Sequence, residues 1–162
     1  MDHLWTPWRM PYLQGEDPLP DECLFCMKPQ EPDEEAHIVH RGELCYVILN
    51  RFPYNNGHVM IAPYAHVGRL EELESETAAE LMALTRLSLS VLREAYQPEG
   101  FNVGANIGSA AGAGIADHVH MHVVPRWAGD TNYMSTVGKA RIIPEWMAET
   151  YERLRPLFDK KR

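Results

Sequence analysis

Residues 118–124, HVHMHVV, place three histidines at every second position, with apolar residues between them. Successive side chains of a β-strand point to opposite faces, so this alternation is typical of a strand. His118, His120 and His122 are then expected to share one face, while the intervening valine and methionine side chains face the core. A chain with this segment is expected to build a sheet that carries three imidazoles on one side.

The same spacing limits what the three imidazoles do together. Same-face residues of a strand lie about 6.5–7 Å apart, which puts the outer pair roughly 13 Å apart. With metal bonds of about 2 Å, one ion reaches neighbouring imidazoles but not both outer ones of a straight strand. At least two different roles are therefore expected. The alternatives are a solvated polar face and a cupin-type metal barrel, but Val123, Val124 and Pro125 stand where such a barrel needs a glutamate.

The remaining pattern predicts an α+β fold with a mainly antiparallel sheet. The expected strands cover residues 44–50, 58–64, 101–107 and 117–125. The first two flank the turn sequence RFPYNNG and predict a β-hairpin. A long helix is expected from an N-cap at Ser75 to a stop at Pro98. A last helix is expected to begin near Pro144 and to end between Leu154 and Phe158.

Length and charge limit the class of protein. With 162 residues, the chain is expected to form one domain (1–162) whose first 36 residues are an irregular arm. The net charge of −8 argues against a general nucleic-acid-binding protein, which would show a basic face. No apolar run reaches the length of a membrane helix, and the N-terminus lacks the apolar core of a signal peptide. No membrane partner and a cytoplasmic location are therefore expected.

Two of the three cysteines, Cys23 and Cys26, form a C-x-x-C pair within the N-terminal arm. An odd cysteine count with such a pair favours a reducing compartment and metal or redox chemistry over a disulfide framework. The pair supplies half of the four ligands that zinc usually takes. A thioredoxin-like redox pair and two unligated thiols are the alternatives. Cys45 lies within an expected strand and is read as a core residue.

Together these segments resemble the histidine-triad (HIT) family, whose motif is His-φ-His-φ-His-φ-φ with φ an apolar residue. HVHMHVV matches that motif, and the resemblance extends over NRFPYNNGHVMIAPYAH, the long helix and the loop GANIGSAAGAGIADH. LWTPWRM and VVPRWAGDTNYM are similar to the bacterial branch related to Fhit and to the small diadenosine tetraphosphate (Ap4A) phosphorylases. The resemblance implies a HIT-like fold with one long and one C-terminal helix, and a homodimer whose two sheets are joined.

The family's nucleophile is the middle histidine of the motif, which corresponds to His120. Imidazole suits this role because much of it is neutral at pH 7, so it needs no deprotonation to attack phosphorus. The resemblance implies a nucleotidyl-histidine intermediate on His120, with the other ring nitrogen held by the backbone carbonyl of His118. His122 and His58 match the histidines that flank the bound phosphates and stabilise their charge. On the residues alone, His58 would be a surface residue at the start of a strand.

The small-residue loop after the third expected strand is expected to contact phosphate, because backbone N–H groups near Gly108 can approach it closely. Asn106 matches the phosphate-binding amide of the family. Members of the family often carry a Gln-Ser or Gln-Thr pair just before the triad, where this chain has Gly114 and Ile115. Ser109 is the expected substitute for that pair.

Two positions on the first hairpin strand are expected to contact the nucleoside. Asn50 resembles the residue that binds the ribose hydroxyls, and its amide can donate and accept at once. On sequence alone it is equally well a plain turn asparagine. The base is expected to rest on Ile48, with Phe52 nearby.

The resemblance also implies partners for the cysteine pair. In zinc-carrying relatives these are a histidine before the long helix and the first histidine of the motif, here His66 and His118. The zinc would be structural, with Cys23, Cys26 and the two histidines closing its shell. His118 would then serve the metal and His120 the chemistry.

The function that follows is a nucleotidyl hydrolase or transferase that cleaves a dinucleoside polyphosphate, Ap4A or Ap3A, through His120. The nearest branch implies phosphate as the acceptor in the second step. Plain hydrolysis and the cleavage of adenosine phosphoramidates are alternatives of the same class. A nucleotide-binding regulatory module that holds an AMP-like ligand and zinc is the alternative from another class.

Overall fold

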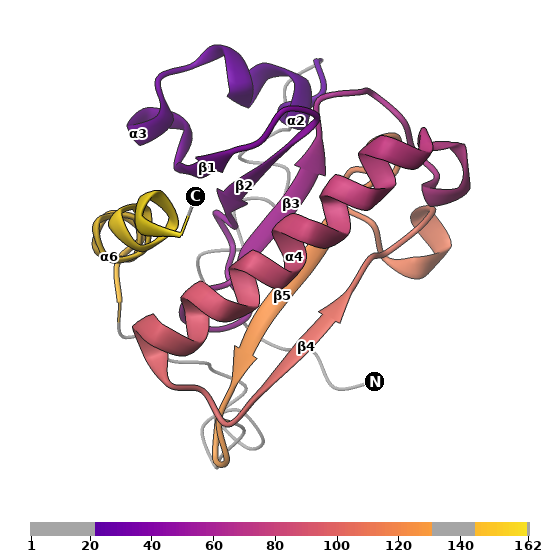
Figure 1. Cartoon of the computed structure of the whole chain (residues 1–162). Helices are drawn as coiled ribbons and strands as arrows, with labels where there is room; N and C mark the ends of the chain where they lie inside the picture. Colours follow the sequence, from indigo (N-terminus) through magenta and orange to yellow (C-terminus); the bar gives the residue numbers. More distant parts are fainter. Residues whose placement is uncertain (1–21, 131–144, 162) are drawn as a thin grey trace.

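A five-stranded sheet forms the centre of the computed structural model, which describes residues 22–130 and 145–161 (Figure 1). The strands are β1 Ile38–Arg41, β2 Cys45–Leu49, β3 Val59–Pro63, β4 Gly100–Gly104 and β5 Met121–Arg126. They lie in the order β1-β2-β3-β5-β4, and every neighbouring pair is antiparallel. The expected antiparallel α+β fold is confirmed.

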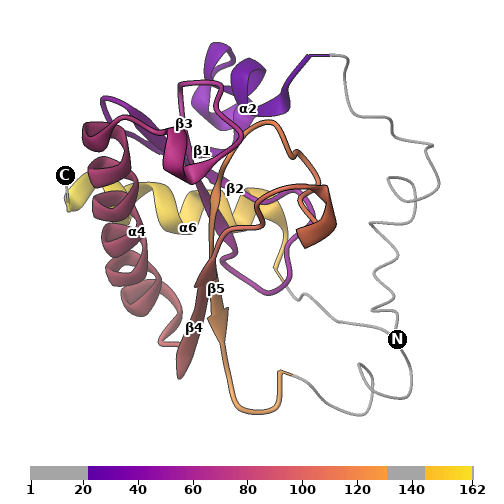
Figure 2. The ribbon, with the colours of Figure 1, turned by 90° about the vertical axis from the view of Figure 1, so that its right-hand side faces the viewer.

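The two long helices cover one face of this sheet and one of its edges. The helices are α2 Leu24–Met27, α3 Asp33–Ala36, α4 Ser75–Tyr96 and α6 Met147–Lys160, with 3-10 turns at Lys28–Gln30, Leu70–Glu72 and Ser109–Ala111. The long helix α4 packs across β2, β3 and β5, while α6 packs against α4 and β1 (Figure 1). Figure 2 shows α4 on one side of the sheet and the segment that joins β4 to β5 on the other. No helix in the described ranges is long and apolar enough to cross a membrane.

Apolar side chains pack on both faces of the sheet, since alternate residues of β2 and β3 point to opposite sides. Val47 and Leu49 join the large core beneath α4, and Tyr46 and Ile48 join a smaller cluster on the opposite face. Phe25 of α2, only 1% exposed, closes this second cluster. The face opposite α4 therefore has a buried apolar layer against which polar side chains can be held in fixed positions.

The N-cap of the long helix lies one residue before the expected one, and the helix begins at Ser75. Glu74, not Ser75, is the N-cap, because the backbone of Glu74 is not helical (ψ 144°) and its carbonyl accepts the Ala78 N–H at 2.9 Å. The helix ends as expected before Pro98, where Gln97 adopts the left-handed conformation (φ 47°).

The strand at 117–125 starts later than expected, at Met121. The backbone N–H of Val119 donates to the carbonyl of Val67 at 2.7 Å instead of to a neighbouring strand, so His118 and His120 precede the regular ladder. The strand expected at 101–107 likewise ends at Gly104.

Other boundaries also differ from the expected ones. Strand β1 was not predicted, because its four residues include His40 and Arg41 and follow an acidic stretch. The described part of the N-terminal arm contains the short helices α2 and α3, so it is not irregular throughout. The last helix starts at Met147 and runs beyond Phe158, and Pro144 lies outside the described residues.

Glu80 of α4 closes the turn between β1 and β2. Its carboxylate accepts the backbone N–H groups of Glu43, Leu44 and Cys45 at 2.8, 2.5 and 3.0 Å. Hydrogen bonds to a charged group contribute about 1.5–3 kcal/mol each. We expect Glu80→Ala to lower the free energy of unfolding by about 3 kcal/mol, measured by urea denaturation. The three backbone N–H groups would lose a charged acceptor, and hydrogen bonds to water would replace only part of that stabilisation.

The matched control for this prediction is Glu76→Ala. Glu76 lies in the first turn of the same helix and is exposed, so its loss removes only a helix-dipole contribution of about 0.5 kcal/mol. Equal destabilisation by the two substitutions would show that Glu80 acts only as a surface charge.

Candidate functional site

The three histidines expected at the reaction centre, His58, His120 and His122, lie together on the sheet face opposite α4. His122 is in β5 and pairs with Met60 of β3, while His58 immediately precedes β3. The His58 and His122 rings have centroids 5.1 Å apart, and those of His120 and His122 are 4.8 Å apart. The structure therefore brings all three expected catalytic side chains into one cluster.

A backbone hydrogen bond fixes the ring of His120. Its Nδ1 lies 2.9 Å from the carbonyl oxygen of His118, so Nδ1 carries the proton and donates it. This is the hydrogen bond expected from the sequence. In the neutral ring, Nε2 then holds a lone pair. Burial lowers the pKa of His120, against the raising effect of that hydrogen bond, so the neutral form prevails at pH 7.

A second chain of hydrogen bonds fixes the tautomers of His58 and His122. The backbone N–H of Tyr54 donates to Nδ1 of His58 at 3.0 Å, so the proton of a neutral His58 is on Nε2. That Nε2 lies 3.0 Å from Nδ1 of His122 and donates to it. The remaining proton of His122 is therefore on its Nε2, where it can serve as a hydrogen-bond donor.

The hairpin loop before β3 is built to hold His58. Gly57 has φ 70°, and a Cβ there would lie 2.7 Å from the Tyr96 ring, so both the backbone and the packing on α4 require glycine. Asn55 donates to the Pro125 carbonyl and to the Asp130 carboxylate, both at 3.0 Å. These contacts tie the loop to the end of β5, the strand that carries His122.

Burial of these rings makes stability depend on pH. Burial, with a smaller contribution from His120, lowers the pKa of His122 from 6.5 to about 4. A lowered pKa means that the unfolded chain binds this proton first, so the stabilisation is complete above pH 6.5 and is lost as the pH falls toward 4. We expect His122 to account for a loss of up to about 2 kcal/mol in the free energy of unfolding between pH 7 and pH 5.

The measurement is urea denaturation at both pH values for the wild type and for His122→Asn. The variant has no imidazole to protonate at this position. Its free energy of unfolding should therefore fall between pH 7 and pH 5 by up to about 2 kcal/mol less than that of the wild type. If the two proteins lose equal stability between pH 7 and pH 5, the ring of His122 is not the titrating group.

The two expected nucleoside contacts lie beside the histidines. Asn50 is half-buried; its Oδ1 accepts the Phe52 N–H at 2.8 Å, and its Nδ2 lies 3.4 Å from Nδ1 of His58. Ile48 is 4% exposed and pairs with Met60, the residue that also pairs with His122. Ile48 therefore shares the face of the sheet that carries the histidine cluster.

The expected phosphate loop begins beside the cluster, because Gly104 pairs with His122 at the end of β4. Gly108 has φ 79°, and a side chain there would meet nothing within 4 Å, so the backbone conformation is what requires glycine. Asn106 is half-buried and Ser109 is exposed. Within the described residues, no hydrogen bond joins either side chain to the histidines, so their expected contacts to phosphate stay predictions.

A cavity of about 420 Å³ opens next to Asn50 and His58. Trp146 and Met147, at the start of α6, form part of its wall. Trp146 is 80% exposed at this mouth. Open space therefore lies beside the predicted ribose contact.

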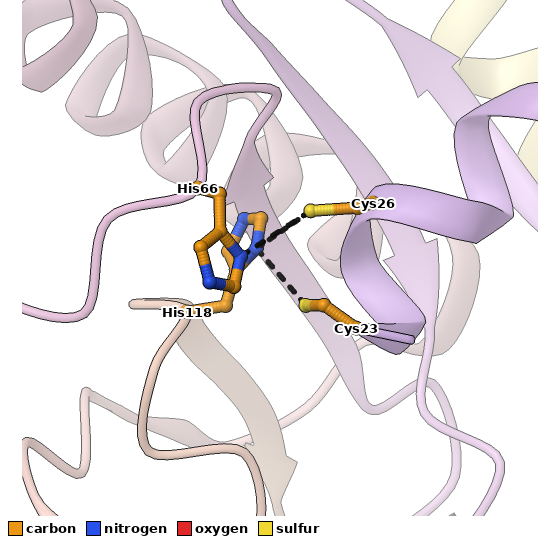
Figure 3. A group of neighbouring side chains, drawn as sticks. All are labelled: Cys23, Cys26, His66 and His118. Atoms are coloured by element: carbon orange, nitrogen blue, oxygen red, sulfur yellow. Dashed lines mark hydrogen bonds between the residues drawn. The ribbon is translucent and has the colours of Figure 1, made fainter. Parts of the chain in front are cut away.

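The four expected metal ligands form a second cluster that adjoins the first. The ligand atoms of Cys23, Cys26, His66 and His118 all lie within 4.8 Å of one another. Figure 3 shows the cysteines of α2 facing the two histidines, which come from the segments after β3 and before β5. The Sγ atoms of Cys23 and Cys26 lie 3.3 Å from Nδ1 of His118 and of His66, respectively.

This donor set fits zinc. With Zn–S bonds of about 2.3 Å and Zn–N bonds of about 2.0–2.1 Å, a tetrahedral site places sulfur and nitrogen about 3.6 Å apart. His118 is fully buried, and its Nε2 donates to the Pro63 carbonyl at 2.9 Å, which leaves Nδ1 for the metal. Burial lowers the pKa of His118 and so keeps it neutral, as a ligand must be.

The Cys26 thiol is harder to ionise than a free cysteine when no cation is bound. Burial, followed by the neighbouring Cys23, raises the pKa of Cys26. Metal binding requires thiolates, so a bound divalent ion would supply the positive charge that this pair lacks.

Sequence reasoning missed the side chain that joins the two clusters. Phe25 lies between the cysteines of the C-x-x-C pair, and its ring centroid is 4.5 Å from that of His120 and 5.3 Å from that of His118. A single phenylalanine in a short helix has no periodic pattern, so no signal in the sequence marks it.

Comparison with known proteins places this chain in a family. The sequence profile of the HIT domain matches residues 31–129. The chain belongs to the HIT family. An AP-4-A phosphorylase of Mycobacterium tuberculosis (strain ATCC 25618 / H37Rv) is 42% identical over 158 residues, which cover 93% of this chain and 80% of the relative. A bis(5'-adenosyl)-triphosphatase of Dictyostelium discoideum is 28% identical over 135 residues, 79% of this chain and 89% of the relative.

A solved structure matches both the fold and the extent of this HIT chain. The crystal structure of a zinc-bound histidine triad family protein from Mycobacterium smegmatis aligns with a TM-score of 0.69 at 27% identity. The alignment covers 86% of this chain and 95% of that protein. The HIT-like fold expected from the sequence is thereby confirmed.

Proposed function

We propose that this chain is a nucleotidyl hydrolase or transferase that cleaves dinucleoside polyphosphates such as Ap4A through a covalent intermediate on His120. The observation that carries this proposal is the 2.9 Å hydrogen bond from Nδ1 of His120 to the His118 carbonyl. It leaves a lone pair on Nε2 of a buried ring beside two further histidines. Relatives named AP-4-A phosphorylase and bis(5'-adenosyl)-triphosphatase support the substrate class.

In the first step, the lone pair of His120 Nε2 attacks the phosphorus of an AMP unit. The N–P bond forms as the bond to the bridging oxygen breaks, and the electron pair leaves with the remaining nucleotide. Nδ1 keeps its proton, so the ring becomes positively charged and its hydrogen bond to the His118 carbonyl strengthens. His122 Nε2–H stabilises the charge on the phosphoryl oxygens, and His58 holds His122 in the donating tautomer.

In the second step, an oxygen nucleophile takes the AMP unit from His120. With inorganic phosphate as acceptor, the new P–O bond gives ADP, the N–P bond breaks and the ring returns to its neutral form. With water as acceptor, the product is AMP. We favour phosphate, because the relative that is 42% identical is named a phosphorylase.

The substrate contacts follow the same scheme. Asn50 would bind the ribose, and Ile48 would support the base from the same strand, β2. Gly108, with Asn106 and Ser109 around it, would place backbone N–H groups and polar side chains near the phosphates. The short path from β4 into this loop, which starts opposite His122, supports that assignment.

Zinc would be held by Cys23, Cys26, His66 and His118 with no open position, so its role would be structural. The donor distances and the zinc-bound relative support this assignment. The two ligand-bearing loops and α2 would then be fixed to one another.

We also propose that residues 1–162 form one domain and that the protein works in the cytoplasm, where its thiols stay reduced.

The remaining partner that we propose is a second copy of this chain. Strand β4 is an edge of the sheet, and Val103 on it is 46% exposed. An exposed apolar edge strand is a template for pairing, and two β4 strands would join two sheets. We expect the wild type to be a dimer by light scattering and Val103→Lys to be mostly monomeric, because the added charge opposes burial.

Val103→Thr keeps the β-branched shape and is the control that should remain dimeric. A monomeric wild type at micromolar concentration would contradict the proposed dimer.

The experiment that tests the proposed function is incubation with Ap4A, with and without inorganic phosphate, followed by chromatography of the products. ADP and ATP that appear only with phosphate identify a phosphorylase, and AMP and ATP in both conditions identify a hydrolase. Tight binding without turnover would overturn the substrate assignment and favour adenosine phosphoramidates or a nucleotide-binding module.

A further inference from the structure

We infer that Phe25 is a positioning residue for the His120 nucleophile, and that its ring is the contact by which the cysteine-bearing helix α2 holds the histidine in place. The inference rests on the proposed function of His120 and goes beyond it, because it assigns a role to a residue outside the histidine triad. The phenyl ring of Phe25 has no group that can bind the proposed metal or take part in the reaction, so its role is to hold the imidazole that it contacts.

The contact itself is close and dry. Phe25 is 1% exposed and His120 is 5% exposed, and their ring centroids are 4.5 Å apart at an interplanar angle of 37°. The same phenyl ring lies 5.3 Å from the centroid of His118. One side chain therefore packs against the histidine whose carbonyl orients the nucleophile and against the nucleophile itself.

The imidazole of His120 needs this contact because a single hydrogen bond to the backbone orients it. One hydrogen bond, Nδ1 to the His118 carbonyl, fixes one edge of the ring of His120, and the ring can still tilt about that bond. Attack on phosphorus needs Nε2 aligned with the bond that breaks, and a misplacement of about 1 Å costs about 100-fold in rate. A flat, buried ring against the imidazole removes that tilt.

Phe25 is in turn held in place by a hydrogen bond from the sheet. Its backbone carbonyl accepts a hydrogen bond from the buried hydroxyl of Tyr46 at 2.7 Å, and Tyr46 lies on the interior strand β2. The flanking residues Cys23 and Cys26 face His118 and His66. The position of the phenyl ring is therefore set both by the sheet, through Tyr46, and by the cluster of Cys23, Cys26, His66 and His118.

The test compares Phe25→Leu with Phe158→Leu. Phe158 is also fully buried and stacks on a histidine, His40, but lies in α6 away from His120. Both substitutions remove a buried ring, so both should lower the melting temperature. Only Phe25→Leu should lower kcat, by about 10- to 100-fold, with KM changed less than about 2-fold.

A second readout needs no substrate. In nitrogen-15 NMR of the imidazoles, wild-type His120 should show a protonated Nδ1 and an unprotonated Nε2. In Phe25→Leu the two nitrogen signals should move toward each other, because the ring exchanges between orientations, and in Phe158→Leu they should stay in place. Failure of the proposed function would appear as no turnover by the wild type, whereas failure of this inference would appear as unchanged signals in Phe25→Leu.

Metal content is measured on the same samples. If Phe25→Leu retains less metal than the wild type, its loss of activity could come from the metal site, and Tyr46→Phe becomes the variant that tests the inference. Tyr46→Phe keeps every ring and both cysteines and removes only the hydroxyl that donates to the Phe25 carbonyl. That variant should shift the His120 signals in the same direction and lower kcat by a few-fold. The inference is overturned if the deciding variant leaves both kcat and the His120 signals unchanged, or if Phe158→Leu changes them equally.

Discussion

Replacing His120 by asparagine is expected to lower kcat for Ap4A cleavage by at least about 10⁴-fold, because the amide nitrogen of asparagine has no nucleophilic lone pair. Binding of Ap4A should remain within about 3-fold of the wild type, since attack by Nε2 is an interaction of the transition state and not of the bound substrate. Stopped reactions followed by mass spectrometry should show an AMP adduct on the wild type and none on the variant. Calorimetry with each protein gives the binding constants.

The matched control is His37→Asn. His37 adopts the left-handed conformation (φ 59°), which asparagine tolerates well, and it lies at the end of α3, outside the histidine cluster. This variant should keep wild-type kcat and should form the adduct. Turnover by His120→Asn within about 10-fold of the wild type would instead place the nucleophile elsewhere.

The clustering of His58, His120 and His122 could be predicted from the sequence because its signal is local. The alternation of His118, His120 and His122 is a property of consecutive residues, and so is the glycine that precedes His58. The structure gives the three histidines of the motif different surroundings, as their expected division into two roles requires: Nδ1 of His118 faces the cysteines, whereas His120 faces His122. A simple strand geometry was sufficient for that conclusion, although the regular strand begins only at Met121.

What the sequence missed depends on contacts between distant residues. Whether Val119 bonds to a strand or to Val67 depends on the path of the loop after β3, which no local pattern encodes. Phe25 reaches His120 across 95 residues of sequence, the difference between positions 25 and 120, only because α2 packs on the face opposite α4. The roles of Asn106 and Ser109 remain predictions, because no hydrogen bond among the described residues joins either side chain to the histidine cluster.

Removing the metal site is expected to have the largest effect on stability. The purified wild type should contain one zinc ion per chain by mass spectrometry, and Cys26→Ser should contain less than about a tenth of that amount. The site would join α2 to two loops, and Cys23 and His118 are 95 residues apart, so the metal would link segments that separate fully on unfolding. We expect the variant to lose at least about 3 kcal/mol, or about 6–12 °C in melting temperature.

Cys45→Ala separates this effect from the loss of any thiol. Cys45 is fully buried on the α4 face, its Sγ donates to the Thr77 carbonyl, and burial raises its pKa to about 12, so it is not a metal ligand. That variant should keep its zinc, and a chelator should lower its melting temperature as it lowers that of the wild type. If chelation leaves the wild-type melting temperature unchanged, the four side chains of this cluster hold the fold together without a metal, and His118 is positioned by its hydrogen bond to Pro63 and its contact with Cys23.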